Sequence, residues 1–301
     1  MIEARRLHIL RAVAEHRTVT AAAAALYLTP SAVSQQLAAL EQETGHRLVE
    51  RSAKGVRLTP AGEILLDHTH VVFAQLERAA AELAAYSSGA AGTLTVASFA
   101  TGIAQVVVPA LVRLAATAPG IRIHVQDAEG DASLPMLLDR QIDVAVAVEY
   151  RGAPSADDPR LTHVPLYAEP FDAVVPLTHR LADLPEVPLA ELAKDPWIGP
   201  YPGNPCHDVI VLACENAGFQ PLLEHTSDDF RAVVALASAD VGVALVPRSA
   251  LRGTDLTGVV VRPVDGVAPT RRVFAAVRRG AEEHPLIRPV LDALSEAAAA
   301  P

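Results

Sequence analysis

The sequence has few of the residues that cross-link secreted proteins or anchor membrane proteins. Only two of its 301 residues are cysteine, Cys206 and Cys214, too few for a disulfide framework. The opening Met1–Arg6 leads into no apolar signal-peptide core, and no uninterrupted apolar run approaches the ~20 residues of a membrane helix. These absences predict a cytoplasmic protein with no transmembrane segment and no membrane partner.

Lysine is nearly absent as well, since Lys54 and Lys194 are the only two and arginine supplies the other basic side chains. The net charge of −10 would argue against nucleic-acid binding if it were spread evenly. It is not, because residues 1–60 carry eight basic and five acidic residues, whereas the remainder carries 17 basic and 30 acidic ones. A basic head on an acidic body indicates nucleic-acid contact at one end, although a solvated surface can show the same split.

The length of 301 residues exceeds one ordinary hydrophobic core and predicts at least two domains. Residues 3–16 place apolar side chains at helical spacing. Thr20 is placed to cap a short helix through Ala25, and Thr29-Pro30 supplies the N-cap and first position of another. The sequence therefore predicts three short helices in a row.

Two short strands follow these helices. Arg47–Arg51 and Val56–Thr59 flank Ser52–Gly55, which has the composition of a four-residue turn. Three helices and a β-hairpin predict a winged helix-turn-helix over residues 1–60.

A longer helix is expected from Thr59-Pro60 onward. Its apolar positions fall into the alternating spacing of a helix–helix seam, with Leu65, Val72, Leu76 and Leu83 as the expected dimerisation residues. Small residues at 87–92 end it as a hinge. We expect a linker and dimerisation helix over residues 61–91, with packing against its own domain as the alternative.

Beyond the hinge, strands and helices alternate, which predicts an α/β domain with a parallel, doubly wound sheet. We expect an effector-binding domain over residues 92–301. Lobe I would comprise about 92–166 and 269–301, and lobe II about 167–268.

Residues 18–62 resemble the DNA-binding signature of LysR-type transcriptional regulators. The resemblance lies in Thr20–Ala23, in Pro30–Leu37, in the exit Leu40–Gly45 and in the wing segments 48–51 and 58–62. Val49 departs from the family, which usually has Phe there. A weaker resemblance continues through 142–145, 176–182 and 239–247, with Gln141 and Asp240 where the family has Gly.

The resemblance implies a periplasmic-binding-protein-like effector domain of two lobes that bind a small molecule between them. It also implies a transcriptional regulator that binds promoter or operator DNA as a homodimer or homotetramer. RNA polymerase is a further candidate partner. No enzyme activity, metal or cofactor is expected, and the identity of the effector stays open.

DNA contacts are expected from the recognition helix and the wing. Val33, Leu37 and Leu40 share one helical face, so Ser31 and Gln35 should face the groove. Glutamine can bond adenine through two atoms, whereas serine hydroxyls suit phosphates or single base edges. The expected DNA-binding residues are Thr20, Ser31, Ser34, Gln35, Gln36, Arg51, Lys54 and Arg57.

Effector contacts are expected beyond the carboxyl ends of the strands and in a loop that precedes a helix. These are Ser98, Phe99, Thr101, Glu149, Tyr201, Asn204, Thr226 and Asp228. An acidic Glu149 at this edge favours a neutral or cationic effector group.

Three other functions compete with this interpretation. Cys206 and Cys214 could form a thiol-based redox sensor, although eight residues on one helix would separate them by ~12 Å, too far for a disulfide without local unfolding. Cys206 with His207 could serve an enzyme, and the two-lobed domain could belong to a solute-binding protein. Neighbours in sequence rarely form a catalytic triad, and a solute-binding protein does not need a winged helix-turn-helix.

Overall fold

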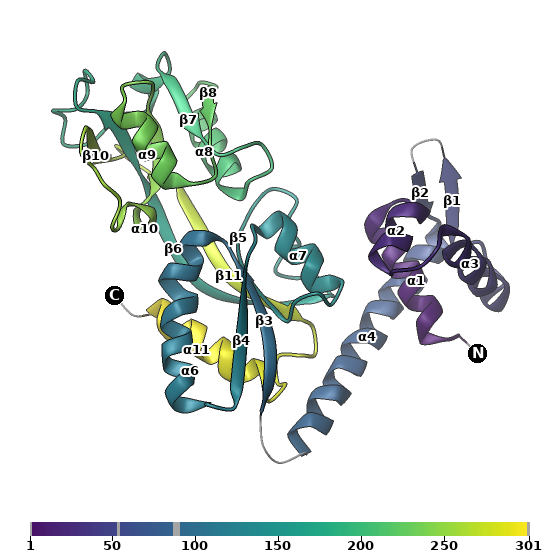
Figure 1. The fold of residues 1–301 in the computed structure, drawn as a ribbon. Helices are drawn as coiled ribbons and strands as arrows, with labels where there is room; N and C mark the ends of the chain where they lie inside the picture. The colour runs from purple at the N-terminus through teal and green to yellow at the C-terminus, as the bar shows by residue number, and fades with distance from the viewer. Residues whose placement is uncertain (1, 53–54, 87–90, 300–301) are drawn as a thin grey trace. The chain divides into compact units, whose positions relative to one another are not determined.

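The computed structural model describes every residue except 1, 53–54, 87–90 and 300–301, and it leaves undescribed the side chains of residues 51 and 52 (Figure 1). The chain divides into two compact units. One comprises Met1–Ser87, Asp157–Thr162 and Arg278–His284, and the other comprises Ser88–Ala156, His163–Val277 and Pro285–Pro301.

The N-terminal part contains α1 (Ala4–His16), α2 (Val19–Ala25) and α3 (Pro30–Thr44), as the sequence predicts. Thr29 caps α3 by accepting a hydrogen bond from the Ala32 amide at 3.2 Å. The expected cap of α2 was wrong. Thr18, whose backbone is extended, accepts from the Ala21 amide at 3.1 Å, and Thr20 lies inside the helix.

The wing consists of β1 (Val49–Ser52) and β2 (Gly55–Leu58), which pair antiparallel. Ser52 pairs with Gly55, so both strands are longer than expected and these two residues of the expected four-residue turn belong to the strands. The other two, residues 53–54, lie outside the described residues. Gly55 has a φ of +118°, and a Cβ there would lie 2.5 Å from the Arg17 carbonyl oxygen. Only glycine lets the wing approach the end of α1 this closely.

The N-terminal core gathers one apolar face from each helix and the wing. Its members are buried, and they include Ile9, Leu10, Val13, Ala22, Val33, Leu37, Leu40 and Leu48. Helix α4 (Pro60–Tyr86) begins against this core. Thr59 accepts a hydrogen bond from the Gly62 amide at 3.1 Å, and a Cβ on Gly62 would lie 2.1 Å from the Leu48 carbonyl oxygen. The cap and the glycine therefore fix the start of α4 on the wing.

The second unit is built on a sheet in the order β10-β6-β11-β5-β3-β4. Strands β3 (Gly92–Ser98), β4 (Ile121–Asp127) and β5 (Val144–Val148) run parallel, as expected. The parallel arrangement does not extend to β11 (Thr270–Arg278), which returns antiparallel to β5. Between β5 and β11 the chain passes through the second lobe, so the connection does not fix the direction in which β11 runs in the sheet.

Helices cover the first lobe. A run of α5 (Ala100–Gly102), the π-helical η1 (Ile103–Val107) and α6 (Val108–Thr117) follows β3, and α6 packs against α11 (Ile287–Ala299). Helix α7 (Gly130–Leu138) packs on β5. The segment Ala100–Thr117 is long and apolar enough to cross a membrane by length and composition, a test that core helices of soluble proteins also pass.

The second lobe forms on the far half of β6 (Leu161–Pro176). There β6 pairs with β9 (Ala244–Pro247) and β10 (Val259–Pro263), while β7 (Pro196–Gly199) and β8 (Leu222–Thr226) form a separate parallel pair. The helices are η2 (Leu189–Leu192), α8 (Pro205–Asn216), α9 (Phe230–Ser238) and α10 (Arg248–Leu251). The core includes Trp197, whose indole N–H donates to the Leu192 carbonyl at 3.1 Å.

Candidate nucleic-acid interface and effector cleft

The recognition helix α3 exposes the residues that its spacing predicts. Ser31 and Gln35 are exposed, whereas Val33, Leu37 and Leu40 are buried. The amide of Gln35 is thus accessible to a base edge in a major groove, while the buried face holds the helix on its domain.

The two adjacent glutamines differ in their surroundings. Gln36 is half-buried, and its Oε1 accepts a hydrogen bond from Nε of Arg6 on α1 at 3.2 Å. The same guanidinium pairs with Glu43 further along α3. Arg6 therefore ties α3 to α1 through Gln36, which leaves Gln35 as the more accessible of the two.

The other expected DNA contacts are spread over α2, α3 and the wing. Thr20 and Arg57 are exposed, and Ser34 is half-buried. Lys54 lies outside the described residues, and only the backbone of Arg51, within β1, is described. The roles of all these residues in DNA binding stay predictions.

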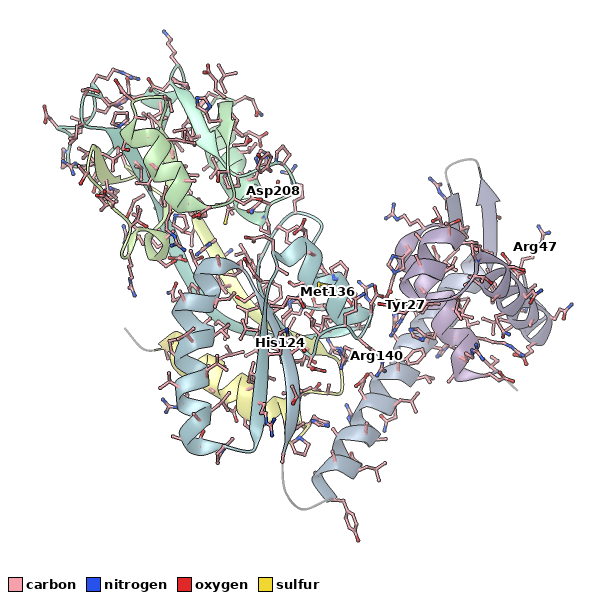
Figure 2. The ribbon with its side chains drawn as sticks, in the orientation of Figure 1. Tyr27, Arg47, His124, Met136, Arg140 and Asp208 are labelled. Atoms are coloured by element: carbon pink, nitrogen blue, oxygen red, sulfur yellow. The ribbon has the colours of Figure 1, made fainter. Side chains whose placement is uncertain are left out.

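Two further residues of this region, Glu41 and Tyr27, were not among the expected DNA contacts. Glu41 accepts hydrogen bonds from the Leu48 and Val49 amides at 2.8 and 3.4 Å, which fastens the end of α3 to the wing. Tyr27, in the turn before α3, has a positive φ of 54° and is 88% exposed (Figure 2). An exposed aromatic beside a recognition helix is a candidate DNA contact, but only the structure reveals its exposure.

A buried arginine lies where the two lobes of the second unit meet. Arg271 on β11 is only 1% exposed. Its Nε donates to Glu169 on β6 at 2.7 Å, and its Nη2 donates to Oγ1 of Thr101 at 2.8 Å and to Oγ of Ser249 at 3.1 Å. Its Nη1 lies 3.6 Å from Sγ of Cys206 at the start of α8. One guanidinium thus joins α5 of the first lobe to α8 and α10 of the second.

Further groups complete this Arg271 cluster. Glu169 accepts from both the amide and the hydroxyl of Ser249 at 2.9 Å. The ring of Phe99 lies 4.9 Å below the guanidinium carbon, a cation–π distance. The hydroxyl of Tyr167 is buried and, within the part of the chain that the structure describes, has no hydrogen-bond partner. An unpaired buried hydroxyl is costly and is a natural contact for a bound molecule.

Several expected effector residues lie at or beside this cluster. Phe99 and Thr101 contact Arg271, while Asn204 caps α8 by accepting from the Cys206 amide at 2.8 Å. Ser98 is fully buried, and its hydroxyl donates to the Phe99 carbonyl at 3.3 Å. The structure therefore gives Ser98 and Asn204 structural partners.

The remaining expected effector residues are more peripheral. Tyr201 is 54% exposed, and its amide donates to the carboxylate of Asp228 at 3.1 Å. Thr226 ends β8, and Glu149 is exposed beside Arg272 at 4.0 Å. Arg271 and Glu169 were not expected from the sequence, because each shares its strand with other charged residues, such as Arg272 on β11 and Asp172 on β6, and nothing local distinguishes it from them.

Glu129, the residue before α7, is the most perturbed acid near the cluster. Burial raises its pKa to about 7, Arg271 opposes this rise, and the negative charge of Asp228 adds to it. Burial also raises the pKa of Tyr167. Near neutral pH the Glu129 carboxyl is thus partly protonated and able to donate as well as accept a hydrogen bond.

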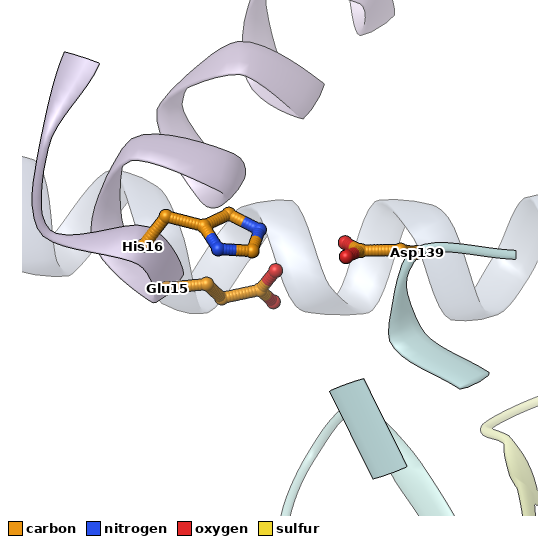
Figure 3. A group of neighbouring side chains, drawn as sticks. All are labelled: Glu15, His16 and Asp139. Atoms are coloured by element: carbon orange, nitrogen blue, oxygen red, sulfur yellow. The ribbon is translucent and has the colours of Figure 1, made fainter. Parts of the chain in front are cut away.

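Figure 3 draws three side chains of types that can bind metal ions, Glu15, His16 and Asp139. Glu15 and His16 belong to one compact unit and Asp139 to the other. Because the relative placement of the units is not determined, this group carries no metal site.

Family models match both parts of the chain. Residues 4–63 match the bacterial regulatory helix-turn-helix protein model of the lysR family, and residues 87–299 match the LysR substrate binding domain. The chain belongs to the LysR family. It is thus a DNA-binding transcriptional regulator with an effector-binding domain, as the signature in residues 18–62 implies.

Individual LysR-family relatives agree with this assignment. A probable hydrogen peroxide-inducible genes activator of Mycobacterium avium is 33% identical over 246 residues, which cover 80% of this chain and 76% of that protein. The transcriptional dual regulator GltC of Bacillus subtilis is 28% identical over 265 residues, 88% of this chain and 87% of that one.

Solved structures of LysR-family regulators share the fold. A hydrogen-peroxide-bound OxyR mutant of Corynebacterium glutamicum has a TM-score of 0.62 at 24% identity, over 98% of this chain and 92% of that one. Full-length CbnR complexed with target DNA has a TM-score of 0.57 at 22% identity, over 99% of this chain and all of that one. At these identities the likeness shows the fold alone.

Burial makes the two thiols of this chain, Cys206 and Cys214, poorly reactive. Both lie on α8 and are buried, and burial raises the pKa of Cys206 to about 11 and that of Cys214 to about 12. Since only the thiolate reacts, both thiols should react with dithionitrobenzoate at pH 8 at least ~100-fold more slowly in the native protein than in urea. Rapid formation of a Cys206–Cys214 disulfide in native protein treated with peroxide would instead support the redox sensor.

Proposed function

We propose that this LysR-family regulator binds a two-fold-related promoter site as an oligomer and changes its DNA contacts when a small effector binds between the two lobes at the Arg271 cluster. The supporting observation is that Arg271 bonds to Thr101 in one lobe and to Ser249 in the other. A molecule that bonds to this guanidinium alters how the lobes are held together.

The effector proposal can be tested with unfractionated or fractionated metabolites, without knowledge of the effector's chemical class. The full chain is titrated with operator DNA in the presence of metabolite fractions, after the bound promoter has been mapped in the chromosome. An effector is recognised by a changed DNA affinity in wild type that Thr101→Val abolishes. If Thr101→Val responds as strongly as wild type does to every active fraction, the effector binds elsewhere.

We further propose that the protein acts in the cytoplasm, where promoter DNA and RNA polymerase are reached, and that it catalyses no reaction. The adjacent Cys206 and His207 support no nucleophile–base pair, because Sγ of Cys206 faces Arg271 while Nδ1 of His207 lies 3.1 Å from the Pro200 carbonyl oxygen. Turnover that requires Cys206 would contradict this proposal.

Helix α4 supports the proposed oligomer. Val72, Leu76 and Leu83 are 39%, 49% and 71% exposed. Apolar side chains that line one side of a helix are usually covered by a partner, so their exposure in the single chain indicates a contact surface. Leu65, the fourth expected residue, packs partly buried against the N-terminal core of its own chain. The exposed seam therefore begins at Val72.

We expect the double variant Leu76→Asp, Leu83→Asp to be monomeric. Two carboxylates in an apolar interface would lose their hydration without gaining partners. Sedimentation velocity measures the change, with Glu82→Asp, an exposed acid on the same helix, as the control. A double variant that still sediments as the wild-type oligomer would show that another surface holds the subunits together.

A further inference from the structure

A cavity lies on the opposite face of β11 from the Arg271 cluster. Arg271 and Arg272 are consecutive residues of one strand, so their side chains point to opposite faces. Arg271 is buried in the cluster, whereas Arg272 lines a cavity of about 380 Å³ between the ends of β5 and β11 and the flank of α8. This volume is within the roughly 300–1,000 Å³ of small-molecule sites.

The strand side of the cavity carries positive charge. Arg151 and Arg272 both line it, and Arg272 is 72% exposed. Glu149 faces Arg272 at 4.0 Å, a distance at the limit of an ion pair. Because exposed ion pairs are weak, a ligand carboxylate can replace Glu149 beside the guanidinium at little cost.

The helix side carries negative charge around an apolar centre. Asp208, Leu212 and Glu215 follow one another at i, i+4 and i+7 on α8 and all line the cavity, and Figure 2 labels Asp208. Leu212 is 48% exposed. Oε1 of Glu215 accepts a hydrogen bond from Gln220 at 2.7 Å, whereas within the described residues Asp208 has no ion-pair partner, so Asp208 is the more available carboxylate.

We propose that this cavity binds a zwitterion with an apolar side chain, that is, a free hydrophobic α-amino acid. Its carboxylate would bond Arg272, its ammonium group Asp208, and its side chain would cover Leu212. A dicarboxylate would meet three carboxylates in the wall, and a simple amine would meet two guanidiniums. Only a molecule that carries both charges is complementary to both sides.

The site is distinct from the Arg271 cluster of the proposed function and is bounded by both lobes. Residues 149–151 and 270–272 belong to the strands and their ends, and residues 208–215 belong to a helix of the second lobe. An amino acid held between them would therefore stabilise one relative position of the lobes, independently of any molecule at Arg271.

Isothermal titration of the full chain tests this proposal with L-leucine and L-phenylalanine as probes, up to about 10 mM, which would saturate a site of millimolar Kd. We expect saturable binding of at least one. N-acetyl-L-leucine, which lacks the ammonium group, and L-leucine methyl ester, which lacks the carboxylate, should each bind about tenfold or more weakly.

Substitutions of the residues that line the cavity test whether the ligand binds there. Arg272→Gln and Asp208→Asn should each weaken amino-acid binding about tenfold, while Arg231→Gln, an exposed arginine on α9, should not. Absence of binding by both amino acids, equal binding of either derivative, or unchanged affinity in both pocket variants would overturn the proposal. Operator binding by the same preparations, measured in parallel, shows whether DNA-binding function is intact whatever the outcome.

Discussion

Replacing Arg271 by alanine is expected to lower the free energy of unfolding by about 3–5 kcal/mol, the cost of breaking one partner of a buried ion pair. The reason is that Glu169, only 7% exposed, would lose the guanidinium that neutralises it. Thr101 and Ser249 would lose a donor at the same time. For a domain of this size the loss corresponds to a fall in Tm of roughly 6–20 °C.

A neighbouring residue supplies the control for this variant. Arg272→Ala removes the same side chain from the opposite face of β11, where it is 72% exposed, and should change stability by less than about 1 kcal/mol. The double variant Arg271→Met, Glu169→Leu should be more stable than Arg271→Ala, because it leaves no unpaired buried charge. Urea unfolding measures all three, and equal losses for Arg271→Ala and Arg272→Ala would contradict the cluster's role.

Gln35→Ala is expected to lower the preference for operator over random DNA by about 1–3 kcal/mol, the discrimination of one bidentate base contact. Gln35 is exposed on the N-terminal half of α3, the part of a recognition helix that contacts base edges. Competition titrations on both DNAs measure the ratio of affinities. Gln42→Ala, an exposed glutamine two turns further along α3, is the matched control and should leave the ratio unchanged.

The wing should respond differently. Arg57→Ala is expected to weaken binding to both DNAs alike and to reduce the salt dependence by roughly one unit, because an arginine on phosphate releases counterions without reading sequence. If Gln35→Ala leaves the operator-to-random ratio unchanged while Arg57→Ala collapses it, the two roles are reversed. The wing would then read the minor groove.

Capping and turn residues in the sequence predicted where helices begin better than they predicted where strands begin. Thr29-Pro30 and Thr59-Pro60 mark the starts of α3 and α4, as N-cap and first-turn residues do. The long strand β6 runs from Leu161 to Pro176, although Pro165 and Pro170 lie within it. Prolines that argue against a strand in sequence are tolerated where the missing N–H needs no partner.

Local sequence signals were sufficient to predict the elements of the DNA-binding domain and the face that its recognition helix exposes. Helical periodicity and most helix caps act over a few residues, so their consequences can be deduced without the fold, although the cap of α2 was expected two residues too late. Which charged side chains contact one another depends instead on the tertiary fold. Arg271 bonds to Glu169 across 102 positions and to Thr101 across 170, and no local rule selects partners so far apart. Packing on the two faces of β11 likewise buries Arg271 and leaves its neighbour Arg272 at the edge of a cavity, because burial is a property of the assembled sheet.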